Sequence, residues 1–71
     1  MRIVHNGEGD ALYARFLRAT VTTEHLAEGI VADYDAEGRL AGIEILDALK
    51  RFGSPQVLRQ VILEDVGLVR A

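Results

Sequence analysis

The feature that most constrains this chain is its shortness combined with a lack of cysteine. It has 71 residues and no cysteine, so disulfide bridges cannot supply the stability that small folds lack. A domain of this size buries only about 60% of the surface that its unfolded form exposes, which is near the lower limit of independent folding. Small folds of this kind often gain the missing burial by oligomerising. We therefore expect one domain over residues 1–71 that associates with a second copy.

Charge and hydrophobicity exclude several classes of protein. Eight basic and eleven acidic residues give a net charge of −3, which argues against a nucleic-acid binder held by phosphate attraction. A hydrophobic content of 49% is typical of a globular chain. No apolar run approaches the roughly 18 residues of a membrane span, and the opening MRIVHNGEGD lacks the apolar core of a signal peptide. We expect a soluble cytoplasmic protein without nucleic-acid or membrane partners.

Strand-type patterns occupy the first two thirds of the chain. Four apolar runs predict strands at residues 1–5, 11–17, 29–34 and 39–46. Glycine-containing stretches at 6–10 and 35–38 predict turns between them. The β-branched run Thr20–Thr23 favours an extended chain over a helix. Residues 1–46 are therefore expected to be β-rich.

The pairing of the last two runs has two solutions. A four-residue loop places one set of side chains on a common face, namely Ile30, Ala32, Ala41, Ile43 and Ile45. A three-residue loop with a bulge at Gly38 instead groups Val31 with Ala41 and Ile43. That second pairing moves Ile30 across beside Glu44.

Residues 47–71 have helical signals. Asp47 is placed to cap a short turn of helix at 48–52, which Gly53 ends. Ser54-Pro55 predicts a second start, with a helix running to about Asp65 and an apolar stripe of Val57, Leu58, Val61 and Ile62. The tail 68–71 is either frayed or a short strand. The predicted fold class is α+β, a small antiparallel sheet of about four strands with one C-terminal helix packed on it.

A single helix covers only one face of such a sheet. Leu12, Ala14 and Phe16 share one face of residues 11–17, whereas Tyr13, Arg15 and Leu17 share the other. An uncovered apolar face predicts a partner surface, and we expect a homodimer around a two-fold axis. The alternative is that the C-terminal segment folds across that face. Tyr13, Arg15 and Leu17 are the candidate interaction surface, which also suits a small protein partner through aromatic and arginine anchors.

The acidic turn has the spacing of a calcium loop. Asp33, Asp35, Glu37, Gly38 and Glu44 fit the pattern D-x-[DN]-x-[DN]-G-x₅-E except for Glu at its third acidic position. Alternating carboxylates of this kind converge on one cation, and the glycine allows the sharp turn. The run before the turn lacks a helical stripe, so a hairpin turn with solvated acids is the preferred interpretation. A metal site through Asp33, Asp35, Glu37 and Glu44 is the alternative hypothesis.

Evidence for catalysis is weak. Glu44 is the one acid in a strongly apolar run, and burial would raise its pKa as in a general acid. A small acid–base enzyme with Glu44 and Asp33 is the third hypothesis, but pairing of Glu44 with Arg15 or at a dimer seam is preferred. The remaining candidates have structural interpretations, since His5 and His25 lack metal-ligand spacing, Ser54 suits a helix cap, and the glycines do not form a phosphate loop. We expect no catalytic residue and no cofactor.

Two stretches of the chain are similar to a known family. Residues 10–13 read Asp-Ala-Leu-Tyr, and residues 29–48 read GIVADYDAEGRLAGIEILDA. These resemble the domain of unknown function 2283 family of short bacterial and archaeal proteins over about residues 3–51. The matching positions are Asp10, Ala11, Leu12, Tyr13, Gly29, Ile30, Asp33, Tyr34, Asp35, Gly38, Gly42, Ile43, Glu44 and Ile45.

Two features depart from that family pattern. His5-Asn6 stands where the family usually has Tyr-Asp, and residues 53–71 extend beyond the usual family end. The resemblance implies a compact β-rich fold and no established activity. Some members lie beside genes for small toxins, so the resemblance also implies an antitoxin-like interaction module.

Overall fold

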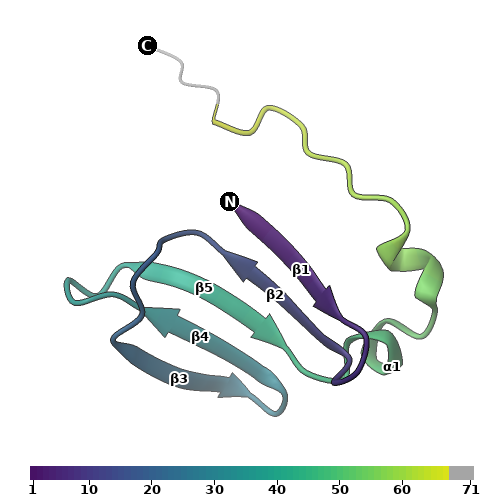
Figure 1. Ribbon diagram of the computed structural model, residues 1–71, viewed down its shortest axis with the longest axis horizontal. Coiled ribbons are helices and arrows are strands. Elements are labelled where there is room, and N and C mark those ends of the chain that lie inside the picture. The colour runs from purple at the N-terminus through teal and green to yellow at the C-terminus, as the bar shows by residue number, and fades with distance from the viewer. Residues whose placement is uncertain (68–71) are drawn as a thin grey trace.

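The computed structural model describes residues 1–67 and contains one antiparallel sheet followed by two short helices (Figure 1). The strands are β1 (Arg2–Asn6), β2 (Ala11–Arg15), β3 (Thr22–Ala27), β4 (Ile30–Tyr34) and β5 (Leu40–Ile45). Their order in the sheet is β1-β2-β5-β4-β3. The helices are α1 (Ala48–Phe52) and the 3₁₀ turn η1 (Pro55–Leu58). The predicted α+β class with a small antiparallel sheet is confirmed.

The sheet has five strands rather than about four. The additional strand is β3, of which the sequence indicated only an extended run at Thr20–Thr23. All six residues of β3 are exposed, and the strand pairs only with β4 at one edge of the sheet. Because β3 buries no apolar face, it lacks the alternation by which strands are recognised.

The β4–β5 hairpin keeps Ile30, Ala32, Ile43 and Ile45 on one face, as in the first of the two predicted pairings. Neither predicted loop length is correct, because Tyr34 pairs with Leu40 and residues 35–39 form the turn. Ile30 lies opposite Ile45, and Ala32 lies opposite Ile43. Glu44 faces Val31, not Ile30. The ladder shifts near the turn, where Asp33 pairs with Gly42 and Tyr34 with Leu40, so the irregularity falls at residue 41 and not at Gly38. One face of the hairpin is thereby apolar.

The C-terminal segment is less helical than predicted. α1 forms as expected, but Asp47 makes no side-chain capping bond. The Ser54 hydroxyl does cap η1, accepting a hydrogen bond from the Gln56 amide at 3.2 Å. The helix predicted to reach Asp65 is wrong beyond Leu58, because residues 59–64 contain no helix. Short helices depend on tertiary packing of their apolar stripe, and that stripe finds little to pack on. The tail 68–71, predicted as frayed or a strand, lies outside the described residues.

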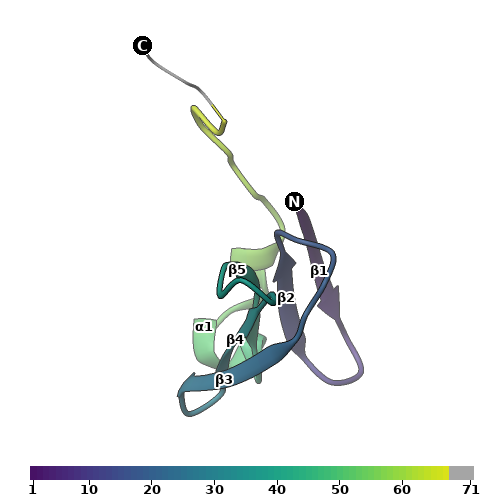
Figure 2. The same cartoon turned by 90° about the vertical axis from the view of Figure 1, so that its left-hand side faces the viewer.

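The two faces of the sheet differ in what covers them. Figure 2 shows α1 on one side of the sheet. We call this side the covered face; by strand register it carries Ile3, His5, Leu12, Ala14, Ile30, Ala32, Ile43 and Ile45. We call the other side the open face; it carries Arg2, Val4, Asn6, Tyr13, Arg15, Val31, Asp33, Gly42 and Glu44. The open face is more polar than the sequence alternation of residues 11–17 suggested.

The core of the single chain is thin. Ala32, Ala41 and Ala48 are completely covered, and Val31 is the largest buried apolar residue. No large side chain within residues 1–67 is fully buried. In the same part of the chain, no helix is long and apolar enough to cross a membrane.

Candidate functional site

Tyr13 reaches across the middle of the open face. Its hydroxyl donates a 2.9 Å hydrogen bond to Asp33 Oδ2, so the side chain from β2 crosses β5 to reach β4. Gly42 of β5 lies beneath it, because a Cβ there would lie 2.6 Å from the Tyr13 hydroxyl and 3.0 Å from the Ala14 carbonyl. Glycine at this strand position therefore permits the close approach of the tyrosine ring.

Asp33 is occupied by structural hydrogen bonds. Its second oxygen, Oδ1, accepts a 2.8 Å bond from the Thr23 hydroxyl. Burial of the phenol, and then the neighbouring Asp33 carboxylate, raise the pKa of Tyr13 above its ordinary value. Tyr13 consequently stays protonated and acts as a donor at neutral pH. Through these two hydrogen bonds, Asp33 of β4 connects to β2 and β3, which is a structural function.

Arginines border this tyrosine on the same face. The Arg15 guanidinium lies 5.4 Å from the centre of the Tyr13 ring, within cation–π range. Arg2 lies directly opposite Arg15 in the β1–β2 ladder, and like charges in that position are destabilising. Neither arginine forms an ion pair with a carboxylate among residues 1–67. The two arginines therefore form a positive site that no ion pair neutralises, although Glu44 lines the same hollow.

Two shallow hollows flank the arginine pair. One, of about 340 Å³, is lined by Arg2, Val4, Asn6, Ala11, Tyr13, Arg15 and Glu44. The other, of about 490 Å³, lies at the strand ends and is lined by Met1, Arg2, Arg15, Phe16, Leu17 and Arg18. The structure thus brings Tyr13 and Arg15, two of the three residues of the candidate interaction surface, into contact. Leu17 joins Arg15 only in the second hollow.

The acidic turn is closed by an arginine. Asp35 Oδ1 accepts hydrogen bonds from the Arg39 amide at 2.8 Å and the Glu37 amide at 3.0 Å, and its Oδ2 pairs with Arg39 Nε at 2.9 Å. The Arg39 backbone bond is the main cause that lowers the pKa of Asp35. Glu37 pairs with the same guanidinium at 2.8 Å. Both carboxylates serve the turn itself.

The four proposed metal ligands are not brought together. Asp33 is held by Tyr13 and Thr23, whereas Asp35 and Glu37 are held by Arg39. Glu44 lies opposite Val31 and lines the open-face hollow. Within residues 1–67 no group of three or more His, Asp and Glu side chains is arranged to hold a metal ion. The proposed acid–base pair of Glu44 and Asp33 is likewise not arranged around one hollow.

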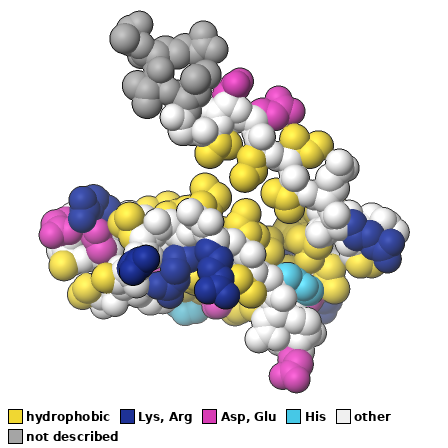
Figure 3. Space-filling view, turned by 45° about the horizontal axis from the view of Figure 1, so that its top comes forward, with side chains coloured by type: hydrophobic (Ala, Val, Ile, Leu, Met, Phe, Trp, Pro, Cys, Tyr) yellow, Lys and Arg dark blue, Asp and Glu magenta, His cyan; other side chains and the backbone are white. Residues whose placement is uncertain are grey.

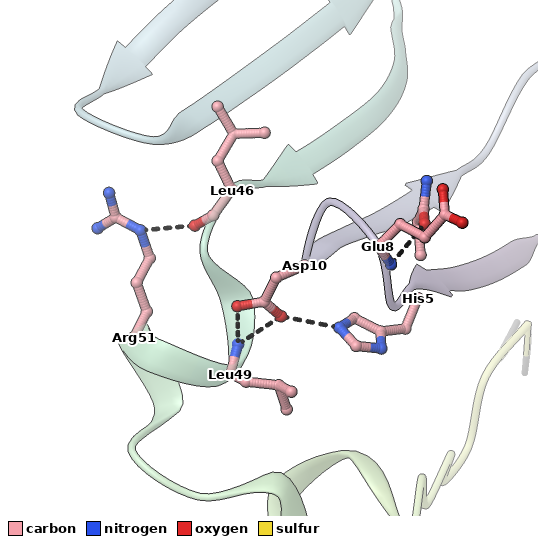
Figure 4. Close-up of polar contacts among 7 residues, drawn as sticks. His5, Glu8, Asp10, Leu46, Leu49 and Arg51 are labelled. Atoms are coloured by element: carbon pink, nitrogen blue, oxygen red, sulfur yellow. Dashed lines mark hydrogen bonds and ion pairs between the residues drawn. The ribbon is translucent and has the colours of Figure 1, made fainter.

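Asp10 attaches the first turn to α1, which the sequence did not reveal (Figure 4). Its carboxylate accepts bonds from the Leu49 amide at 3.0 and 3.1 Å, and its carbonyl accepts from the Ala48 amide at 2.8 Å. His5 Nε2 lies 2.9 Å from Asp10 Oδ1. The His5 contact first, and the Leu49 amide next, lower the pKa of Asp10. Asp10 is thus the capping acid of α1 from 39 residues away in sequence, which explains why the adjacent Asp47 was chosen wrongly.

Arg51 makes a second attachment at the other end of α1. Its Nε donates to the Leu46 carbonyl at 2.8 Å and its Nη2 donates to the Glu28 carbonyl at 2.6 Å. Gly29, with φ of 77°, lets the guanidinium lie against the β3–β4 turn, since a Cβ there would collide with it. Asp10 and Arg51 together fix the short helix to the one end of the sheet where β2 and β4 begin and β5 ends. The only sequence signal for the Arg51 contacts was the presence of basic residues in the last turn of α1, where they can bond carbonyl groups.

An apolar slot opens beyond α1. We call residues 59–67 the arm; it leaves η1 and runs away from the sheet (Figure 1). A hollow of about 520 Å³ lies between the covered face and the start of the arm, lined by Ile3, His5, Leu12, Phe52, Val57, Leu58 and Val61. We call residues 1–58 the body, and Figure 3 shows hydrophobic side chains of arm and body facing one another across this hollow. We call this hollow the slot.

The match to known families covers most of the chain. The model of the family described as "Protein of unknown function (DUF2283)" matches residues 3–48. The chain belongs to the DUF2283 family. The family region includes the Tyr13–Asp33–Gly42 arrangement and Asp10, and ends at the first residue of α1. A comparison with curated proteins and one with solved structures find no match.

Proposed function

We propose that this DUF2283 protein is a small protein-interaction module that works as a homodimer. The two copies meet through the slot and the arm, and the open face of each copy stays available to another protein. The observation that supports this proposal most strongly is the amount of surface that one chain exposes.

The exposed area is too large for a compact single chain. A folded monomer of 7.8 kDa is expected to expose about 4,400 Å², whereas this chain exposes 5663 Å². Its radius of gyration of 13.6 Å compares with about 11 Å for a compact domain of this length. The excess surface exceeds the roughly 800 Å² that each partner contributes to a standard interface. A second copy would cover such an area.

Exposed apolar side chains are concentrated in η1 and the arm, next to the slot. Val57, Val61, Ile62, Leu63 and Val66 are each at least half exposed. Ile3 on the adjacent β1 is also exposed. Burying apolar surface contributes about 25 cal/mol per Å², so association would supply the burial that the alanine-lined core lacks.

The open face suits a different contact. Arg2 and Arg15 lie side by side without an internal carboxylate partner among residues 1–67, and Tyr13 presents its ring beneath Arg15. Arginine and tyrosine are enriched among residues that carry binding energy. The chemistry favours a protein partner that offers carboxylates. Covering a small toxin, as an antitoxin does, would use this face.

The mass of the particle in solution tests the dimer. Sedimentation and light scattering over about 1–200 μM chain should give twice the chain mass at the upper end, since an interface of standard size commonly gives micromolar or tighter affinity. A particle of single-chain mass throughout that range would overturn the proposed function.

The partner surface has a separate test with matched variants. The protein would be used to retain partners from its native host, comparing wild type with Arg15→Glu and with Glu8→Arg, an opposite charge reversal in the β1–β2 turn. A partner at stoichiometric amounts should be lost with Arg15→Glu and kept with Glu8→Arg. Retention by both variants would exclude the open face as the contact.

A further inference from the structure

We propose that two copies associate by pairing their arms antiparallel, with Ile62 on the two-fold axis. This inference rests on the proposed dimer and specifies its interface. It commits the slot and arm to a second copy of this chain. The argument uses the sequence symmetry of the arm, its unsatisfied backbone, and the position of Val61 at the slot.

The arm is self-complementary about Ile62. Residues 59–65 read Arg-Gln-Val-Ile-Leu-Glu-Asp, with a basic start, an apolar centre and an acidic end. An antiparallel pair centred on Ile62 places Val61 opposite Leu63 of the other copy. At the ends of the paired segment, Arg59, where η1 ends, comes near Glu64 of the other copy and Asp65, whose left-handed φ of 52° ends the arm's extended run. Two-fold symmetry repeats each favourable contact, which is how an isologous interface forms.

The backbone of the arm is available for such pairing. Residues 60–64 belong to no helix or strand. Within residues 1–67 their amides and carbonyls form no backbone hydrogen bond outside regular elements, the last such bond being from Arg59 to Gln56. Extended apolar residues with unpaired backbone groups form a template for strand pairing. A second arm that runs antiparallel to the first matches its charges, because the basic start of each arm then lies beside the acidic end of the other.

The slot gives the paired arms an apolar surface to cover. Val61 already lines the slot together with Ile3, Leu12 and Val57. Residues directly opposite in an antiparallel pair lie on the same face, so Leu63 of the second copy would join Val61 there. Each copy thus completes the slot of the other with a side chain that is 61% exposed in the single chain.

A single cysteine tests the position of the axis. The chain has no cysteine, so Ile62→Cys introduces one thiol per copy. Opposed residues of antiparallel strands have Cα atoms about 4.5–5.5 Å apart, which a disulfide can span. Under mild oxidation Ile62→Cys should form a covalent dimer at least tenfold faster than Leu26→Cys, a matched exposed site on β3. Equal rates for the two variants would overturn the arm pairing.

Charge reversal provides an independent test on the reduced, full-length protein. Arg59→Glu should weaken dimerisation about tenfold, because two symmetric ion pairs become repulsive. Glu64→Arg should act similarly, and the double variant should return to within about threefold of wild type. Arg18→Glu, which makes the same charge change on the body, is the control.

The outcomes separate the inference from the proposed function. Arm pairing would be refuted, and the dimer left intact, by three results together. The wild type is a dimer, Ile62→Cys forms a disulfide no faster than Leu26→Cys, and Arg59→Glu changes the dimer affinity no more than Arg18→Glu does. In a double variant that carries both Ile3→Cys and Leu63→Cys, a disulfide within one chain would show instead that the arm folds back on its own β1. A single-chain mass at every concentration would refute both proposals.

Discussion

The body and the arm of this protein have similar proportions of apolar residues but reach very different structures. In the body, strands β1 to β5 pair in one sheet, and Asp10 and Arg51 fix α1 to it. In the arm, Val61, Ile62 and Leu63 remain 60–66% exposed. The difference is the availability of partners, because a strand needs a neighbouring edge and a helix needs a face on which to pack. Hydrophobic composition alone does not create a core.

The largest effect is expected in the centre of the body, where packing is closest. Gly42→Val would place its Cβ within 3.0 Å of the Tyr13 hydroxyl and the Ala14 carbonyl. Relief of this overlap requires Tyr13 to leave Asp33, so we expect a loss of about 2–3 kcal/mol in the free energy of unfolding. Urea denaturation measures it. Gly7→Ala is the control, since no atom lies within 4 Å of the added Cβ; an equal loss there would contradict the packing argument.

The arm should behave in the opposite way, with a large effect on association and little on the fold. Replacing both Val61 and Leu63 with serine should weaken dimerisation about 100-fold, because it removes two apolar side chains per copy from the interface. The free energy of unfolding at dilute concentration should change by less than about 0.5 kcal/mol. Sedimentation and urea denaturation measure the two quantities separately. Val21→Ser with Leu26→Ser, on the opposite side of the body, should leave the affinity unchanged.

Helix α1 lies between the strands and the arm. Removing the contacts that attach it to the sheet should lower the free energy of unfolding by an intermediate amount. Arg51→Ala removes the bonds to the Leu46 and Glu28 carbonyls. We expect a loss of about 1 kcal/mol for this exposed guanidinium, measured by thermal unfolding. Lys50→Ala is the matched neighbour and should be close to neutral. If both variants behave alike, the guanidinium contacts do not hold the helix.

The link across the open face should contribute somewhat less. Tyr13→Phe keeps the ring beneath Arg15 but removes the hydroxyl bond to Asp33, at a cost of about 1 kcal/mol or less. Equilibrium unfolding compares this variant with Tyr34→Phe. An unchanged stability would show that the Thr23 bond alone satisfies Asp33.

The smallest expected effect is the loss of folding stability at low pH. Folding lowers the pKa of both Asp10 and Asp35, so the folded state binds fewer protons than the unfolded state. Their contribution to stability is therefore complete above the ordinary aspartate pKa of about 4 and is lost as the pH falls through the lowered values. Melting temperatures between pH 2 and 6 should show this decline, and Asp35→Asn should flatten it. A steeper decline of the melting temperature in Asp35→Asn would contradict the prediction that the lowered pKa of Asp35 stabilises the folded state.

Much of the body could be predicted because its signals are local. The alternation around Tyr13, the glycine-containing turns and the apolar runs of β4 and β5 each indicate a strand or turn. β3 was missed because all its residues are exposed and it has no apolar face. The helix beyond Leu58 was predicted from a stripe that has the correct period, but Val57, Val61 and Ile62 of that stripe stay at least half exposed.

The candidate surface was only partly predictable. Tyr13 and Arg15 were chosen from their shared face, and they do lie in contact. The roles of Asp33 and Asp10 depend on residues 20 and 39 positions away, so no local spacing could indicate them. The calcium-type spacing was misleading for the same reason, since Arg39 and Tyr13 occupy the carboxylates that the pattern would have directed at a cation.

The sequence by itself determined the class of the fold, the positions of most strands and the scarcity of material for a core, since period, turn residues and chain length are properties of the chain alone. The tertiary structure decided which side of the sheet α1 covers, which carboxylates are occupied, and that the apolar side chains of the arm stay largely exposed. These depend on which distant strands become neighbours, and that is set by the combined burial and hydrogen bonding of the whole sheet rather than by any one segment.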